Sequence, residues 1–408
     1  MRLIYVLVFM APQFLLYFYL HERLPDPRRP ARAALVRGVL AVTFLIFNTP
    51  WLFVAHRVLF GTLWGISKIP FTGPWVAWQL LGWVFGALVA AYVAGKGVLW
   101  LVGRIERWKL GRVDPVVAFE LSDAPPVRLS RRQFMARATY SYAIAGAAVS
   151  GYGIWSAYRM PLVTRRTLSF PDLPAGLDGL TLLHVSDLHA GAHMGGDRMQ
   201  EIVAQANGLA PDLILETGDM IDISPSFIPG YVRAFRELHA PLGCVTVLGN
   251  HDHYTGAPAV ARGVQEAGHV LVTNGCHVIE RNGATLALLG IDDPGTWTMD
   301  DPQAAFVDAA LRATPPEAFK ILLAHRPGAW DSAVPRRIPL PLAGHIHGGQ
   351  FYLPVIGWSA GCLITKYVMG HFEREGSQLY VSRGIGVVGV PIRLFVPPEI
   401  ELFTLRRA

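Results

Sequence analysis

Five short clusters of polar residues each follow an apolar, strand-like segment in the second half of the sequence. They are Asp187-Leu188-His189, Gly218-Asp219, Gly249-Asn250-His251-Asp252, Ala324-His325 and Gly344-His345-Ile346-His347. Carboxylates, imidazoles and amide oxygens are ligands that suit divalent ions such as Mn, Fe, Co or Zn. No cluster contains cysteine, so a thiolate site is not expected. The residue types predict a metal site built from nitrogen and oxygen ligands.

The clusters hold more candidate ligands than one ion needs. The seven candidates are Asp187, His189, Asp219, Asn250, His325, His345 and His347. Seven side chains complete two shells of four if one carboxylate is shared. Two ions about 3.5–4 Å apart can clamp the attacking and leaving oxygens of an in-line displacement at phosphorus. The set therefore predicts two bound divalent ions and phosphoryl chemistry.

The elements that must position these residues begin near residue 160, where short β-rich segments alternate with helical ones. Helices are expected at 197–209, 230–239, 257–267 and 302–313, and strands at 180–186, 213–216, 244–248, 270–273, 277–280, 285–291, 320–323, 340–343, 379–382 and 400–405. This mixture predicts α/β layers with a mixed sheet. Sites in open α/β sheets form beyond the carboxyl ends of the strands. We therefore expect the five clusters to converge on one crevice.

The ordered series DLH, GD, GNHD, H and GHIHGGQ resembles the calcineurin-like metallophosphoesterase family. The likeness covers roughly residues 178–408. The GHIHGGQ form, together with the tail at 382–405, is most similar to a membrane-associated bacterial branch of that family. The branch includes twin-arginine-exported phosphodiesterases and some UDP-2,3-diacylglucosamine pyrophosphate hydrolases. The resemblance implies an α/β fold, namely a two-sheet sandwich flanked by helices.

The family pattern also implies a role for each candidate residue. It assigns Asp187, His189 and His347 to the first ion, Asn250, His325 and His345 to the second, and Asp219 to both. His251 would be the catalytic acid that protonates the leaving oxygen, a role that suits imidazole because its pKa lies near working pH. The two cations would lower the pKa of a bound water and so provide the nucleophile.

Other polar residues near the clusters have less specific expectations. Arg383 lies beyond a predicted strand and could bind a substrate phosphate, with a solvated surface arginine as the alternative. His184 lies within the first predicted strand and is expected in the core. Asp222, Asp292 and Asp293 follow strand ends and are expected to be turn and cap residues.

The first 160 residues have a different character. Of the 408 residues, 52% are hydrophobic and 16% are charged, which is too apolar for an ordinary soluble protein. The excess lies in apolar segments at 3–20, 38–60 and 75–102, each near the length that spans a bilayer, and in a weaker segment at 138–158. The predicted organisation is a transmembrane, all-α region at 1–103, a linker at 104–137, the fourth segment at 138–158 and the metallophosphoesterase domain at 160–408.

Basic residues predict how these segments are oriented. The connections at 21–37, 56–74 and 104–137 carry five, two and eight Lys or Arg residues, and cytoplasmic loops are the more basic ones. The segment Ser130–Met135, with Arg131 and Arg132, resembles a twin-arginine export signal. The sequence thus predicts a multi-pass protein of the bacterial cytoplasmic (inner) membrane with its catalytic domain on the outer, periplasmic face. The net charge of +6 is explained by these loops, so no nucleic-acid partner is expected.

The combined prediction is a membrane-anchored, binuclear metal-dependent phosphoesterase that hydrolyses phosphodiesters or pyrophosphates, lipid-linked substrates included. Two alternatives stay open. One is a cytoplasmic-facing UDP-2,3-diacylglucosamine pyrophosphate hydrolase. The other is an inactive metal-binding scaffold, which the presence of every predicted ligand and of the acid disfavours.

Overall fold

The structure is a computed structural model, and it describes residues 17, 30–48, 148–293 and 303–408. The chain divides into two compact units, residues 1–151 and Tyr152–Ala408. The second unit holds all five polar clusters. The predicted domain boundaries fall mostly in segments outside the described residues, so they stay predictions.

The predicted membrane location is contradicted. In the ranges that the structure describes, no helix is both long and apolar enough to cross a bilayer. Helix α2 (Pro30–Asn48) begins inside the expected loop at 21–37. Its uncharged part, residues 38–48, is shorter than the about 20 residues that span a membrane. The segment at 75–102, the twin-arginine motif, most of the segment at 3–20 and the first ten residues of the segment at 138–158 lie outside the described residues.

The second unit is built on two six-stranded mixed sheets. The first has the order β1 (Leu162–Phe170), β14 (Glu399–Arg407), β2 (Thr181–Val185), β3 (Leu213–Glu216), β4 (Cys244–Thr246) and β5 (Val270–Leu271). The second has the order β12 (Gly370–Arg374), β13 (Ser377–Val381), β9 (Leu340–Ala343), β8 (Phe319–Leu323), β7 (Ala284–Gly290) and β6 (Gly275–Arg281). Strands β2 to β5 are parallel to one another, as are β7, β8, β9 and β13.

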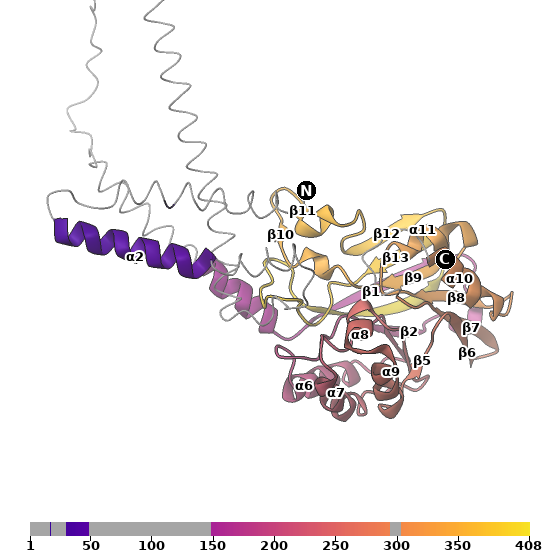
Figure 1. Ribbon diagram of the computed structural model, residues 1–408. Coiled ribbons are helices and arrows are strands. Elements are labelled where there is room, and N and C mark those ends of the chain that lie inside the picture. The colour runs from indigo at the N-terminus through magenta and orange to yellow at the C-terminus, as the bar shows by residue number, and fades with distance from the viewer. Residues whose placement is uncertain (1–16, 18–29, 49–147, 294–302) are drawn as a thin grey trace, which may run out of the picture. The chain divides into compact units, whose positions relative to one another are not determined.

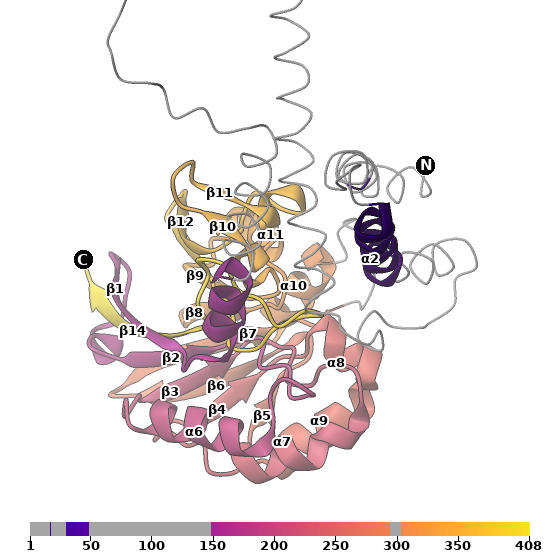
Figure 2. The same ribbon diagram turned by 90° about the vertical axis from the view of Figure 1, so that its left-hand side faces the viewer.

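Helices cover the outer faces of both sheets. Figure 2 shows α6 (Gly196–Asn207), α7 (Ile228–Phe235) and α9 (Ala257–Glu266) against the first sheet. Helices α10 (Gln303–Arg312) and α11 (Ala329–Ala333) lie beside the second sheet in Figure 1. Shorter elements fill the connections: α8 (Asn250–Thr255), β10 (Tyr352–Leu353), β11 (Trp358–Ser359), and the 3-10 turns at 175–177, 225–227, 334–336, 347–349 and 360–363. The α/β sandwich flanked by helices is therefore confirmed.

Three apolar layers hold these elements together. Alternate residues of a strand point to opposite faces of its sheet. Leu182 of β2 accordingly packs between the two sheets, while Leu183 and Val185 pack against the helices. A third layer joins the second sheet to α10 and α11. Because both faces of each sheet are covered, the central strands read as nearly continuous apolar runs.

The predicted strands are present, and the structure adds β1, β12 and the two-residue strands β10 and β11. Strand β1 was not expected because its sequence, LVTRRTLSF, has two central arginines and mostly exposed side chains. It pairs in parallel with β14 over nine residues. The five polar clusters follow β2, β3, β4, β8 and β9, so one edge of the sandwich gathers them as predicted.

We predict that a fragment of residues 152–408 folds without the preceding residues. Its early segment is tied to the rest of the unit, because Arg393 N donates to Gly153 O at 2.9 Å and Arg198 donates to the carbonyls of Tyr158 and Arg159. A single cooperative urea transition is expected, with protected amides in β2, β3 and β8 by hydrogen exchange. A fragment starting at 172, which lacks β1, should be less stable. Absence of protection in the longer fragment would contradict this prediction.

Candidate metal centre

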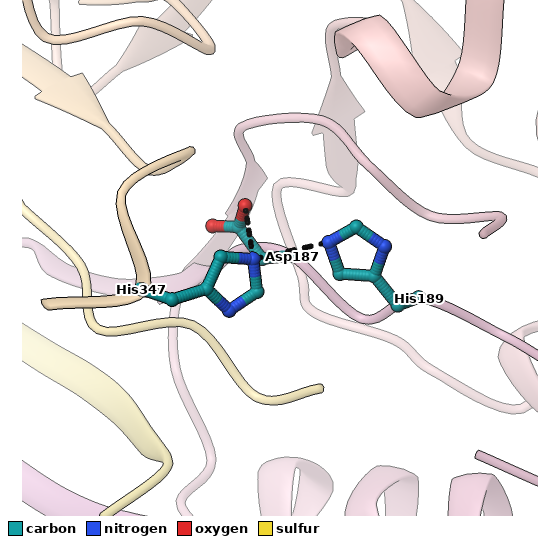
Figure 3. Close-up of side chains that lie close together, drawn as sticks. All are labelled: Asp187, His189 and His347. Carbon is teal, nitrogen blue, oxygen red and sulfur yellow. Dashed lines mark hydrogen bonds and ion pairs between the residues drawn. The ribbon is translucent and has the colours of Figure 1, made fainter. Parts of the chain in front are cut away.

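The first predicted group of ligands is assembled from both sheets. Asp187 and His189 follow β2 of the first sheet, and His347 follows β9 of the second. His347 Nε2 lies 3.3 Å from Asp187 Oδ1 and 3.1 Å from His189 Nε2. Figure 3 shows the three side chains converging on a common point.

The second predicted group lies around His325. Its Nε2 atom is 3.1 Å from Asn250 Oδ1 and 3.1 Å from His345 Nδ1. The same Nε2 atom is 3.1 Å from Asp219 Oδ2. His325 is oriented from behind, because its Nδ1 is 2.8 Å from the carbonyl oxygen of Thr217. Because a carbonyl can only accept, Nδ1 carries the proton and donates it to this hydrogen bond, which leaves the Nε2 lone pair for the centre.

Asp219 stands between the two groups. Its Oδ2 atom is 3.1 Å from His325 Nε2 and 3.5 Å from His189 Nε2. The structure therefore brings all seven predicted ligands together. Asp219, the carboxylate predicted to be shared, lies between the two groups.

The donor atoms fit two divalent ions. Metal–ligand distances of about 2.0–2.2 Å place neighbouring atoms of a tetrahedral shell about 3.3–3.6 Å apart. The observed separations of 3.1–3.5 Å lie at or about 0.2 Å below that spacing, so small side-chain movements would accommodate the ions. Six of the seven side chains are buried, and burying carboxylates is costly unless cations compensate them.

A buried carboxylate supports the loop that carries Asp219. The Asp252 side chain accepts hydrogen bonds from the backbone N–H groups of Asp219, Ile221 and Gly249 at 2.8, 3.0 and 2.9 Å. Burial, followed by the charge of Asp219, raises the pKa of Asp252 to about 6. A Cβ atom at Gly249 would lie 2.2 Å from Asp219 Oδ1, so the loop can approach this closely only with glycine there.

The backbone is strained at the same place. Five of the seven predicted ligands have positive φ angles: Asp187, His189, Asp219, His345 and His347, with values from 50° to 72°. Left-handed backbone is uncommon for residues with a side chain and costs about 1–3 kcal/mol each when sparsely populated regions are occupied. Such strain concentrates at functional sites because the surrounding structure must impose it.

His251 borders the first group without belonging to it. Its Nδ1 atom lies 2.8 Å from the carbonyl oxygen of Asp222 and 3.2 Å from Asp222 Oδ1. Burial alone would lower its pKa, but the hydrogen bond to Asp222 and the charge of Asp219 outweigh burial and raise the pKa to about 9. Bound cations would lower this value. In this environment the imidazole can carry a proton at neutral pH.

The comparisons with known proteins agree with this geometry. The sequence profile of the calcineurin-like phosphoesterases matches residues 180–349. An uncharacterised metallophosphoesterase of Bacillus subtilis (strain 168), YkuE, is 30% identical over 292 residues, which cover 68% of this chain and 98% of the relative. The chain belongs to the calcineurin-like metallophosphoesterase family. Membership implies hydrolase activity on phosphoesters.

Two further relatives extend the likeness. An uncharacterised metallophosphoesterase of Aquifex aeolicus (strain VF5) is 29% identical over 247 residues, which cover 60% of this chain and 91% of the relative. A zebrafish (Danio rerio) protein, described as a transmembrane protein with metallophosphoesterase domain, is 31% identical over 284 residues. That match covers 67% of this chain and 63% of the zebrafish protein.

Asp222 is the site residue of this metallophosphoesterase that the sequence analysis missed. Expected to be a turn or cap residue, it lies between two imidazoles, with Oδ1 3.2 Å from His251 Nδ1 and 3.6 Å from His189 Nδ1. These histidines hold the pKa of its carboxyl well below the usual range, against the effect of burial. Its place three residues after Asp219, in the same loop, was the signal that could have revealed it.

Arg383 is already engaged in the structure. Its guanidinium forms a close ion pair with the buried Glu399, and its backbone N–H donates to Glu399 Oε1 at 3.1 Å. Its predicted role in binding phosphate stays a prediction. Asp292 and Asp293 likewise have side-chain partners, in His253 at 2.8 Å and Arg326.

We predict that Asp219→Asn weakens binding at both metal sites, whereas Asp187→Asn weakens mainly one. The reason is the central position of Asp219 between the two groups. Calorimetric titration of the metal-free protein with Mn²⁺ should show two binding events in the wild type. Metal affinity should fall at least tenfold when a ligand is removed. Tenfold is the smallest loss usually found when a residue that only supports a ligand is removed. Asp308→Asn, at an exposed ion pair with Arg336, is the matched control. Equal effects of the two site variants on both events would argue against a shared carboxylate.

Proposed function

We propose that this chain is a binuclear metal-dependent phosphoesterase that hydrolyses phosphodiester or pyrophosphate bonds. The observation that carries the proposal is the position of Asp219 between two groups of ligands. This arrangement suits two adjacent ions rather than one. Two bound ions would supply an activated water and would neutralise the phosphoryl oxygens.

The side chains around the centre suit the remaining steps. The Nδ1 atom of His251 donates to the Asp222 carbonyl, so Nε2 is the atom that can deliver a proton to the leaving oxygen. Asp219 Oδ1 accepts the backbone N–H of His251 at 2.8 Å. The backbone of the proposed acid is therefore bonded directly to the carboxylate that faces both groups, which holds His251 beside the centre.

A cavity next to the centre is the proposed site for the organic part of the substrate. It has a volume of about 380 Å³, and its lining includes His345, Arg326, Ile346, Ile364, Lys366 and Tyr367. The two isoleucines suit an apolar group. Lys366, an exposed cation whose Nζ lies 3.5 Å from Asp331 Oδ2 in the same lining, suits a second anionic group. Ile364 and its neighbour Leu363 are largely exposed, which supports keeping lipid-linked phosphoesters among the proposed substrates. Within the described residues nothing favours the diacylglucosamine hydrolase or the inactive scaffold over this proposal.

The decisive test is a panel of substrates on the full-length protein loaded with Mn²⁺, Co²⁺, Zn²⁺ or Fe²⁺. Bis-nitrophenyl phosphate, an alkyl phosphodiester, a nucleotide pyrophosphate and nitrophenyl phosphate cover the diester, pyrophosphate and monoester classes. Turnover of a diester or pyrophosphate that disappears with chelator supports the proposal. Failure to turn over any of them with two ions bound would reject it.

We predict that His251→Ala slows hydrolysis of an alkyl phosphodiester by roughly 10²–10⁴-fold, the usual contribution of a general acid. The loss should be much smaller for nitrophenyl esters, because nitrophenolate leaves without a proton. Activity of the wild type on the alkyl ester should fall as pH rises through the pKa of His251, at or below about 9. The variant should lack that decline. Equal losses with both leaving groups, at unchanged metal content, would exclude His251 as the acid.

We also predict that Lys366→Ala raises KM about twofold to fivefold for substrates with a second anionic group, as expected from losing one exposed charge contact. The KM for bis-nitrophenyl phosphate should not change. Arg233→Ala, which removes an exposed charge on α7, is the control. An equal change in KM for both substrate types would place the second anion elsewhere.

A further inference from the structure

Two ionisable side chains lie in the apolar layer between the two sheets. His184 of β2 and Glu401 of β14 are cross-strand partners, and neither is exposed to solvent. On the same strand faces, Leu182 and Phe403 belong to the apolar layer. Buried ionisable pairs are often no more stabilising than apolar residues of similar volume. Folding alone therefore does not explain why this pair is present.

A chain of hydrogen bonds leads from this pair to Asp187. His184 Nε2 lies 2.8 Å from Thr217 Oγ1. The Thr217 hydroxyl donates to Ser186 Oγ at 2.7 Å, and the Ser186 hydroxyl donates to Asp187 Oδ2 at 2.6 Å. All four residues in this series of hydrogen bonds are buried.

The number of available protons fixes which group donates in each hydrogen bond of this series. The hydroxyl proton of Thr217 is used on Ser186, so the Thr217 oxygen can only accept a proton from His184 Nε2. The other ring nitrogen, Nδ1, faces Glu401 Oε2 at 3.4 Å. Neither of these two buried atoms has a hydrogen-bond partner among the described residues, and 3.4 Å is longer than a usual hydrogen bond. With a proton on Glu401 Oε2 directed at Nδ1, all donors of the series point towards Asp187.

The protonation states agree with that direction. Burial lowers the pKa of His184 to about 3 and raises the pKa of Glu401 to about 8. Glu401 is thus the partner that holds the shared proton, with its other oxygen accepting from the Ser382 hydroxyl at 3.0 Å. The pair has no net charge, which suits its apolar surroundings.

The last hydrogen bond of the series distinguishes the two oxygens of Asp187. Oδ2 accepts from Ser186 at 2.6 Å, whereas Oδ1 faces His347 Nε2 at 3.3 Å. The backbone N–H of His345 lies between the two oxygens, at 3.0 Å from Oδ1 and 3.1 Å from Oδ2. The carboxylate has little room to turn, because a Cβ atom at Gly344 would lie 1.9 Å from Ser186 Oγ and 2.2 Å from Asp187 Oδ2. The Ser186 hydroxyl thus contacts only Oδ2, and Oδ1 is the oxygen that faces His347 in the centre.

We propose that His184 and Glu401 are positioning residues that act through Thr217 and Ser186 to hold Asp187 for the first metal ion. This inference rests on the proposed role of Asp187 as a ligand. Groups that orient a metal ligand typically change metal affinity by about 10–100-fold when they are removed. Because this pair acts through two intervening hydroxyls, a change near tenfold is expected.

The test measures Mn²⁺ binding to the metal-free, full-length protein by calorimetry, together with its unfolding by urea. His184→Leu and Glu401→Leu should each weaken one of the two binding events by about tenfold and leave the other within twofold. Stability of the metal-free protein should fall in each single variant, because one buried polar group loses its partner. It should stay the same or rise in the double variant His184→Leu/Glu401→Leu, in which apolar residues replace the whole pair and the affinity loss should persist. The matched control is Glu401→Gln, whose amide N–H can donate to His184 Nδ1 and whose oxygen can accept from Ser382. It should bind Mn²⁺ within twofold of the wild type.

Several outcomes would overturn the proposal. Unchanged affinity in both leucine variants would do so, as would equal losses in Glu401→Gln and Glu401→Leu. Reduced stability without a change in affinity would show a purely structural role. If the leucine variants do not fold, Thr217→Val interrupts the same series of hydrogen bonds with a side chain of equal shape. Unchanged Mn²⁺ affinity in that variant would reject the proposal. No substrate is needed, so absence of phosphoesterase activity would count against the proposed function and leave this result intact.

Discussion

The crowding of ligand atoms at one edge of the sandwich is the constraint on which the rest of the site depends. Nitrogen and oxygen atoms from seven side chains lie 3.1–3.5 Å from their neighbours, mostly out of contact with water. Lone pairs this close repel one another unless protons or cations lie between them. The loops are held against that repulsion by the hydrogen bonds that Asp252 accepts from the backbone. The left-handed backbone at Asp187 and Asp219 is part of the same arrangement.

The two sheets contribute to each group of ligands jointly. In the first group, Asp187 comes from the first sheet and His347 from the second; in the second group, Asn250 and His325 are divided in the same way. Neither sheet alone can offer a complete shell to an ion. Metal binding should therefore stabilise the packing of one sheet on the other, because a ligand that binds only the assembled form shifts the equilibrium towards it.

The sequence was informative where chemistry is local and silent where it depends on contacts distant in the chain. Strand and helix periodicity located the elements around the clusters, and residue types identified the seven candidate ligands. Asp222 was not recognised, because its two histidine partners lie 33 and 29 residues away and only its place in the loop of Asp219 pointed to the site. Strand β1 was missed because it is mostly exposed and is defined by its pairing with β14, more than 200 residues later. The apolar run at 38–60 suggested a span from composition alone, and composition does not reveal where a helix such as α2 begins.

The position of β14 has a consequence for how the protein is made. This strand lies between β1 and β2, and it pairs with both, yet it is synthesised after every other strand that the structure describes. Until residues 399–407 leave the ribosome, β1 lacks its partner and β2 exposes an unpaired edge, the kind of edge that recruits other chains. Domains that must wait for a late segment spend longer in such aggregation-prone forms. The nascent chain would thus be vulnerable to aggregation until the strand that carries Glu401 has left the ribosome and paired with β2.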